Sequence, residues 1–164
     1  MDLIYTDKKR RDVGVITSYE LDMAFGKDEN DFLLKVDLEE HCCEAGAFVY
    51  FQDTEYGGII DKICPNTKTS TVGYEGRTWH GILNSKVIVP DVGEDYFTVS
   101  GEANQILHVL ISRVGLEDLF SVTTSDSGVT IDYQFARYVF LYDSIRDMLY
   151  ENSAKLQMSY DGSK

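Results

Sequence analysis

The sequence predicts an α+β protein in which a small antiparallel β-barrel or sandwich is followed by a two-helix α+β subdomain. Three observations lead to this prediction. Residues 1–90 alternate short apolar segments with turn-rich breaks, residues 91–164 contain two amphipathic helical patterns, and Pro90-Asp91 separates the two regions. Apolar side chains make up 43% of the 164 residues, which is enough for a real core.

The first region is predicted to contain six short strands. Residues 34–38 read Leu-Lys-Val-Asp-Leu, an alternation typical of a half-buried strand. Pro65 is expected to end the fifth strand, because proline lacks the N–H that a sheet ladder needs. Six short strands with half-polar faces favour a small barrel or sandwich that bends on its glycines. The six candidates are Leu3–Thr6, Val13–Glu20, Phe32–Leu38, Ala47–Gln52, Gly57–Cys64 and Thr69–Tyr74.

The pattern changes after Gly76. Trp79, Ile82 and Leu83 recur at helical spacing, which predicts a short helix over Arg77–Ser85. Lys86–Val89 then reads as a brief strand that Pro90 ends. We therefore place the boundary between the two regions at Pro90-Asp91.

Two amphipathic helices are expected in the second region. Ser100 can cap the first, which Gly115 should stop, and Asp143 lies near the positive N-terminal end of the second. The expected buried stripes are Ile106, Leu107, Leu110, Ile111 and Val114 in the first helix and Tyr142, Ile145, Met148, Leu149 and Asn152 in the second.

The remaining elements of the second region are short. Phe120–Thr124 and Gly128–Tyr133 are expected to form a hairpin through Ser125-Asp126-Ser127, and Lys155–Tyr160 to form a closing strand. Residues 161–164 read as a loose tail. The whole region is expected to be an α+β subdomain.

Charge argues against a nucleic-acid partner. The formal net charge is −13, from 28 acidic and 15 basic side chains, and a surface of this sign repels phosphate backbones. Four of the basic residues form the run Lys8-Lys9-Arg10-Arg11. Because this run is isolated, we expect a solvated turn between two strands and no binding patch.

No apolar run approaches the length of about 20 residues that spans a bilayer, and no signal-peptide pattern follows the basic run. We therefore expect a soluble, unsecreted protein. The three cysteines, Cys42, Cys43 and Cys64, are an odd number with two neighbours, which favours a reducing compartment such as a bacterial cytoplasm.

A metal site was considered at His41, Cys42, Cys43 and Cys64. Neighbouring cysteines on an extended chain point to opposite faces, and no C-x-x-C spacing occurs. We expect no metal site here. The alternative is that Cys42 or Cys43 is a small buried hydrophobe, which is where free cysteines usually lie.

A Cys–His hydrolase would need a nucleophile and a base brought together by the fold. His80, beside Trp79, and His108, between Leu107 and Val109, are instead expected to be partly buried structural residues. The acidic pairs Glu39-Glu40, Glu94-Asp95 and Glu117-Asp118 are expected to be solvated, since no EF-hand spacing occurs, and no phosphate-binding glycine loop is present. No catalytic, cofactor-binding or metal residue is predicted, and no cofactor is expected.

Eleven tyrosines are unusual for this length, and eight lie in or beside predicted elements. An aromatic ring with a polar tip suits an interface, and tyrosine also packs well at the rim of a small barrel, so both uses remain open. The eight are Tyr50, Tyr56, Tyr74, Tyr96, Tyr138, Tyr142, Tyr150 and Tyr160.

The order of three segments carries a resemblance. Gly57–Ile63 reads GGIIDKI, Tyr74–Ile88 reads YEGRTWHGILNSKVI, and Phe135–Tyr138 precedes the helical segment Leu141–Leu149. Together they resemble the tail proteins of long-tailed bacteriophages (siphoviruses) and prophages, the family that includes baseplate-hub-like proteins. The resemblance covers about residues 1–160 and rests on turn and core residues. Because the second half resembles the inserted α+β region of this family, the resemblance implies that residues 91–164 are an incomplete insertion.

This resemblance implies a structural component of the virion tail tip, assembled in the host bacterial cytoplasm, and no enzyme. It implies other copies of the chain in a ring and neighbouring tail proteins as partners, with no nucleic acid and no membrane span. The ring would link the tail tube to receptor-binding or cell-wall-penetrating parts. Members of the family are usually much longer, which is consistent with a fragment or an N-terminal domain.

Two other functions remain open at this point. One is a small tail-associated hydrolase or peptidase, which the lack of paired catalytic motifs disfavours. The other is an acidic adaptor that binds a protein partner through a strand edge.

Overall fold

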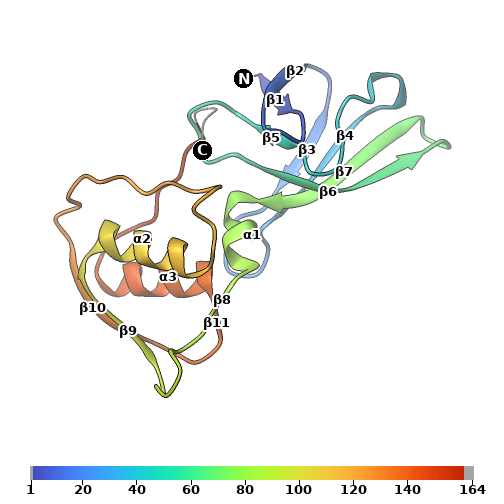
Figure 1. The fold of residues 1–164 in the computed structure, drawn as a ribbon. Coiled ribbons are helices and arrows are strands. Elements are labelled where there is room, and N and C mark those ends of the chain that lie inside the picture. The colour runs from blue at the N-terminus through green and yellow to red at the C-terminus, as the bar shows by residue number, and fades with distance from the viewer. Residues whose placement is uncertain (1, 161–164) are drawn as a thin grey trace. The chain divides into compact units, whose positions relative to one another are not determined.

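A computed structural model describes residues 2–160; residues 1 and 161–164, which include the predicted tail, lie outside the described part. The fold is α+β, as predicted, and divides into two compact units (Figure 1). The first unit runs to Ile82 and takes in the described residues from Met158 on. The second unit is Leu83–Gln157.

The first unit is built on one seven-stranded sheet in which every neighbouring pair is antiparallel, in the order β2-β1-β5-β6-β7-β4-β3. The strands are β1 (Leu3–Thr6), β2 (Asp12–Ile16), β3 (Glu20–Met23), β4 (Asp31–Asp37), β5 (Phe48–Tyr50), β6 (Gly57–Asn66) and β7 (Thr71–Thr78). A 3₁₀ turn, η1 (Leu38–Glu40), follows β4, and α1 (Trp79–Asn84) follows β7. Among the described strands β2 and β3 do not pair with each other, so the sheet is not a closed barrel.

Several strand boundaries differ from the prediction; β7, for example, continues to Thr78 and so includes the first two residues of the predicted helix. The segment Val13–Glu20 does not form one strand, because the chain leaves β2 after Ile16 and returns as β3 at the opposite edge of the sheet. Pro65 does not end β6, where it lies opposite Val72 of β7. Since β5 pairs only with Gly57–Ile59, the missing N–H of Pro65 faces no β5 partner.

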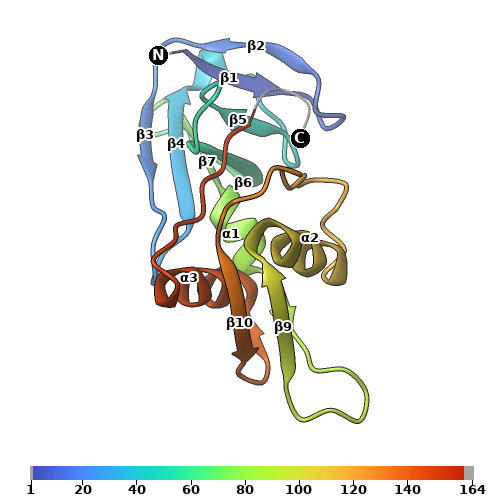
Figure 2. The ribbon, with the colours of Figure 1, turned by 90° about the vertical axis from the view of Figure 1, so that its left-hand side faces the viewer.

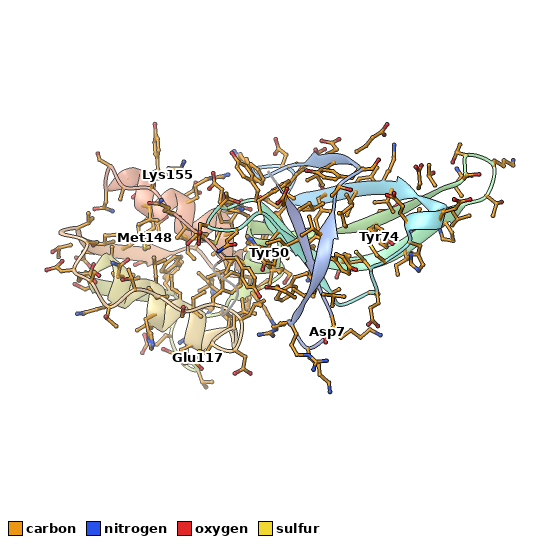
Figure 3. The ribbon with its side chains drawn as sticks, turned by 90° about the horizontal axis from the view of Figure 1, so that it is seen from above. Asp7, Tyr50, Tyr74, Glu117, Met148 and Lys155 are labelled. Atoms are coloured by element: carbon orange, nitrogen blue, oxygen red, sulfur yellow. The ribbon has the colours of Figure 1, made fainter. Side chains whose placement is uncertain are left out.

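The basic run forms the turn between β1 and β2, as expected. The carboxylate of Asp7 accepts the backbone N–H groups of Lys9 and Arg11 at 2.7 and 3.0 Å and pairs with the Arg11 guanidinium at 2.6 Å. These hydrogen bonds from Arg11 hold the pKa of Asp7 below its usual value. Figure 3 labels Asp7 in this turn.

The sheet of the first unit buries a core whose members come from most of its strands. Alternation along β4 places Phe32, Leu34 and Val36 inside, as the sequence pattern predicts. The other buried members are Leu3, Ile16, Cys43, Ala47, Val49, Ile60, Val72 and Tyr74.

The short strand β5 is buried on both faces. Val49 joins the core, while Phe48 and Tyr50 point to the other face and meet Trp79 and Tyr160 in a group that we call the aromatic cluster. Ring centroids in the cluster lie 4.4 to 5.9 Å apart. No strand is assigned to Lys155–Tyr160, so that prediction is wrong; the backbone oxygen of Tyr160 accepts the N–H of Asp53 at 3.1 Å.

The second unit contains two small ribbons and two helices (Figure 2). Its elements are β8 (Val87–Ile88), β9 (Phe97–Glu102), α2 (Ala103–Arg113), β10 (Thr130–Phe135), β11 (Val139–Phe140) and α3 (Leu141–Glu151). β9 pairs with β10, and β8 pairs with β11, both antiparallel. Four members of the predicted stripe of α3, Tyr142, Ile145, Met148 and Leu149, are buried, whereas Asn152 is half-buried and forms the C-cap.

The division between the units follows Ile82, whereas the sequence pattern placed a boundary at Pro90-Asp91. The reason is the pairing of β8 with β11, together with a hydrogen bond from Leu141 N–H to the Lys86 carbonyl at 2.8 Å. These bonds tie residues 86–88 to the start of α3. None of the helices in residues 2–160 is long and apolar enough to cross a membrane.

Two local predictions in the second unit are wrong. Ser100 lies inside β9, and Glu102 caps α2 by accepting the N–H groups of Asn104 and Gln105, both at 2.9 Å. Phe120–Thr124 is not a strand, because β10 takes β9 as its partner. The expected hairpin turn instead bonds to the start of α2, where the backbone and hydroxyl of Ser127 donate to Glu102.

Candidate functional site

Three residues considered as ligands or nucleophiles lie together beside Tyr74, whose side chain is fully buried. The N–H groups of Cys42 and Cys43 donate to the Tyr74 hydroxyl at 3.2 and 3.3 Å, and the hydroxyl lies 2.6 Å from His41 Nδ1. A phenol hydroxyl has two acceptor lone pairs and one proton, so here it donates to Nδ1. The His41 ring also stacks on the Tyr74 ring, which Figure 3 labels.

The two neighbouring cysteines do not point to opposite faces, so that expectation is wrong. Their sulfur atoms lie 3.5 Å apart, because residues 41–46 form an irregular segment and not a strand. Cys43 is buried, as expected of a small hydrophobe, and Cys42 is exposed. Burial raises the pKa of both thiols, and most strongly that of Cys43, because desolvation disfavours the thiolate.

The other two histidines lie on different elements. His80, on α1, is buried against Phe25 with 5.5 Å between ring centroids, which confirms the expected burial. His108, on α2, is exposed, so the expectation of partial burial is wrong. The apolar stripe of α2 turns Ile106, Leu110 and Ile111 inward and leaves His108 outside.

Acidic residues are abundant, but they do not form a ligand cage. The three acidic pairs singled out above are all exposed. An open depression of about 290 Å³ beside β3, β4 and β7 is lined in part by four carboxylates, from Asp22, Glu29, Asp31 and Glu75. Within residues 2–160, no three histidine, cysteine, aspartate or glutamate side chains are placed to hold a metal ion.

The most unusual surface lies on the β8–β11 ribbon of the second unit. Val87 and Phe140 are register partners, and both are exposed, at 38% and 54%. Val89, which follows β8, and Tyr138, which precedes β11, are 46% and 66% exposed. The intervening Ile88 is buried, so the ribbon face opposite Val87 and Phe140 covers the core. We call the four exposed residues the ribbon patch.

Tyr138 is held in a strained backbone conformation. It occupies the turn between β10 and β11 with φ of +54°, in the left-handed region that glycine and asparagine adopt more readily. A bulky residue there costs roughly 1–3 kcal/mol unless the surroundings compensate. Strained residues of this kind concentrate at functional sites, and this one presents an aromatic ring to solvent.

Charges beside the ribbon patch are balanced. Arg113 pairs with Asp91 at 2.7 Å, donates to the Val89 carbonyl and lies 4.0 Å from the centre of the Phe97 ring. Arg137, next to Tyr138 in sequence, pairs with Asp95 at 3.6 Å. A shallow groove of about 330 Å³ adjoins the patch, lined by Lys86, Val87, Val89, Pro90, Asp91, Arg113 and Val114.

A second exposed apolar feature lies at an edge of the sheet in the first unit. β2 pairs with β1 only, so its outer edge has no partner among the described strands. Val13 and Val15 on this strand are exposed, and no lysine or proline lies within it. Edge strands use lysine, proline, other charged residues or bulges to prevent pairing with other chains, and β2 has one charged residue, Asp12, and an irregular register with β1.

The tyrosines divide evenly between the two uses that the sequence left open. Tyr50, Tyr74, Tyr142 and Tyr160 are buried, whereas Tyr56, Tyr96, Tyr138 and Tyr150 are exposed. Only Tyr138 of the exposed four belongs to the ribbon patch.

The ribbon patch was not predicted from the sequence, because β8 and β11 are two residues each and leave no periodic signal.

Comparison with known proteins adds no relative. No protein family model matches the sequence, and no curated protein matches it.

Proposed function

We propose that the chain is a structural component of the tail tip of a long-tailed bacteriophage or prophage, a baseplate-hub-like protein that works through protein–protein contacts. The observation that carries the contact role is the ribbon patch, where Val87 and Phe140 are exposed as register partners and Val89 and Tyr138 are exposed next to them along the chain. Monomeric proteins rarely expose contiguous apolar patches larger than a few hundred Å² without a binding function. The tail setting is supported by the resemblance of residues 1–160.

Other copies of the chain are the partners proposed for this surface. Two copies with a net charge of −13 repel each other, so a self-contact is favoured where charges cancel. The ion pairs of Arg113 and Arg137 provide this balance beside the ribbon patch.

A ring also needs two different surfaces on each copy, because a head-to-tail contact is not self-complementary. The open β2 edge, with Val13 and Val15, supplies a second surface in this proposal. A strand added there by a neighbouring protein would extend the sheet.

The setting is tested with particles from the bacterium that carries the coding sequence. Tails are purified after prophage induction and analysed by mass spectrometry, and an antibody against the chain is located by electron microscopy. The proposal expects peptides of the chain in purified tails and label at one end of the tail. Intact particles without the chain would contradict the proposed setting.

The neighbouring coding sequences provide an independent test. A tail component is expected close to a very long, helical, tape-measure-like protein and another tail protein. A neighbourhood of metabolic enzymes would reject the tail setting and reopen the hydrolase hypothesis.

A further inference from the structure

The neighbouring cysteines of the first unit are close enough to react with each other. Their sulfur atoms lie 3.5 Å apart, and a disulfide bond is about 2.05 Å long, so the sulfurs must approach by about 1.5 Å. Cys42 and Cys43 lie outside any strand, so no sheet ladder fixes their backbone. Local rotation of the two side chains and their peptide can supply the approach.

The third cysteine cannot compete for either sulfur. Cys64 lies 3.5 Å from the Glu75 carboxylate, on the exposed face of the sheet. Glu75 follows Tyr74 on β7, so the two side chains point to opposite faces. Since the N–H groups of Cys42 and Cys43 bond to Tyr74, the pair lies on the core side and Cys64 on the other.

We infer that Cys42 and Cys43 form a redox-sensitive dithiol, which a peroxide closes to a disulfide between the two neighbouring residues and a thiol reductant reopens. This inference does not depend on the proposed function, since it rests on sulfur geometry and accessibility alone. Exposed Cys42 meets the oxidant first, and buried Cys43 is the resolving thiol.

The reaction takes two balanced steps. In the first, the Cys42 sulfur attacks hydrogen peroxide, the O–O bond breaks, and a sulfenic acid and one water form. In the second, the Cys43 sulfur attacks that sulfenic sulfur, the S–O bond breaks, and the disulfide and a second water form. The sulfur pair loses two electrons and two protons, and the peroxide is reduced to two waters.

Ring closure changes the contacts around Tyr74. A disulfide between adjacent residues spans Cα atoms about 3.8 Å apart, shorter than the usual disulfide range, so the ring is strained and readily reduced. The peptide shared by the two residues carries the N–H of Cys43, so its rotation weakens the bond from that N–H to the Tyr74 hydroxyl, which also holds His41. The amide hydrogen of Cys43 is therefore expected to exchange faster in the oxidised protein.

Intact-mass spectrometry tests the inference on the full chain. The reduced protein is treated with hydrogen peroxide, denatured and labelled with a maleimide. The oxidised monomer is expected to be lighter by two hydrogen atoms and to take up one maleimide, whereas the untreated protein takes up three. Dithiothreitol should restore all three reactive thiols.

Matched variants assign the bond. Cys64→Ser should still lose two hydrogen atoms, while Cys42→Ser and Cys43→Ser should not, with circular dichroism confirming that each variant folds. Three reactive thiols remaining after peroxide treatment would overturn the inference, as would oxidation only to linked dimers or to sulfinic acid.

Phenylarsine oxide binds a pair of neighbouring thiols without oxidising them. This test does not require Cys42→Ser or Cys43→Ser to fold. Two thiols displace its oxygen as water and bind the arsenic together. The wild-type protein and Cys64→Ser should each bind one equivalent. Failure of both to bind would contradict the claim that the two thiols can act as a pair.

Discussion

Two groups of aromatic side chains, one in each unit, lie in opposite environments. In the first unit Phe48, Tyr50, Trp79 and Tyr160 are buried against one another, with Phe48 and Trp79 rings edge to face at 5.2 Å. In the second unit Phe140 and Tyr138 are exposed on a ribbon whose opposite face already covers a core. The contrast teaches that side chains of the same chemistry stabilise the fold in one place and remain free for contact in the other. Substitutions should therefore separate stability from association.

The largest expected difference is between two phenylalanines. Phe48→Ala removes a buried ring and should lower the free energy of unfolding by about 3–5 kcal/mol. Phe140→Ala removes an exposed ring and should change it by no more than about 0.5 kcal/mol. Urea unfolding followed by circular dichroism measures both. Equal losses in the two variants would break the comparison.

Gly57 tests how tightly the aromatic cluster of the first unit is packed. A Cβ on Gly57 would lie 2.7 Å from Tyr50 Cβ and 2.8 Å from the Trp79 ring, so the aromatic cluster leaves no room for it. Gly57→Ala should destabilise the first unit by roughly 1–3 kcal/mol through overpacking. The fluorescence of Trp79, the sole tryptophan, reports the unfolding. Gly26→Ala is the control, since a Cβ there meets nothing within 4 Å.

Tyr138 tests the ribbon patch of the second unit, because its replacement should raise the stability of the fold and weaken association. Tyr138→Asn relieves the left-handed backbone and should raise the free energy of unfolding by about 1 kcal/mol. The same change removes an exposed ring from the ribbon patch and should weaken association. Thermal unfolding and light scattering on one sample measure the pair of effects. A variant that both destabilises the fold and leaves association unchanged would show that the ring serves packing alone.

The smallest expected effect is on the pH dependence of the stability of the second unit. This stability does not depend on the exposed ribbon patch. Hydrogen bonds from the Ser127 hydroxyl and from the Asn104, Ser127 and Gln105 N–H groups lower the pKa of Glu102 to about 2. The unfolded pKa is about 4.3, so this contribution is present above that pH and is lost as the pH falls toward 2. The melting temperature of wild type should therefore fall more between these values than that of Glu102→Gln. Parallel curves would contradict the assigned role of Glu102.

Elements that depend on one segment of the chain were predicted correctly. The alternation in β4 and the apolar stripe of α3 could be predicted because each segment buries one face of its own strand or helix. Ser100 was misassigned as a cap because β9 is stabilised by pairing with β10, about thirty residues away in the chain. The return of Tyr160 to the aromatic cluster is likewise a long-range contact with no local signature.

The candidate site was not predicted, because it too depends on contacts between distant segments and on irregular backbone. Val87 and Phe140 become neighbours only through the pairing of two strands of two residues each, which are too short for a periodicity. The proximity of the Cys42 and Cys43 sulfurs depends on an irregular backbone that an extended-chain argument could not anticipate.

The central claim, that the ribbon patch joins copies of this chain, is tested most directly by sedimentation equilibrium of wild type, Phe140→Lys and Tyr150→Lys over a range of concentrations. Tyr150 is 83% exposed near the C-terminal end of α3 and lies outside the patch, so its variant controls for the same change in charge. The account predicts concentration-dependent association for wild type and Tyr150→Lys, and a monomer for Phe140→Lys. A monomeric wild type, or Phe140→Lys associating as strongly as wild type, would contradict it.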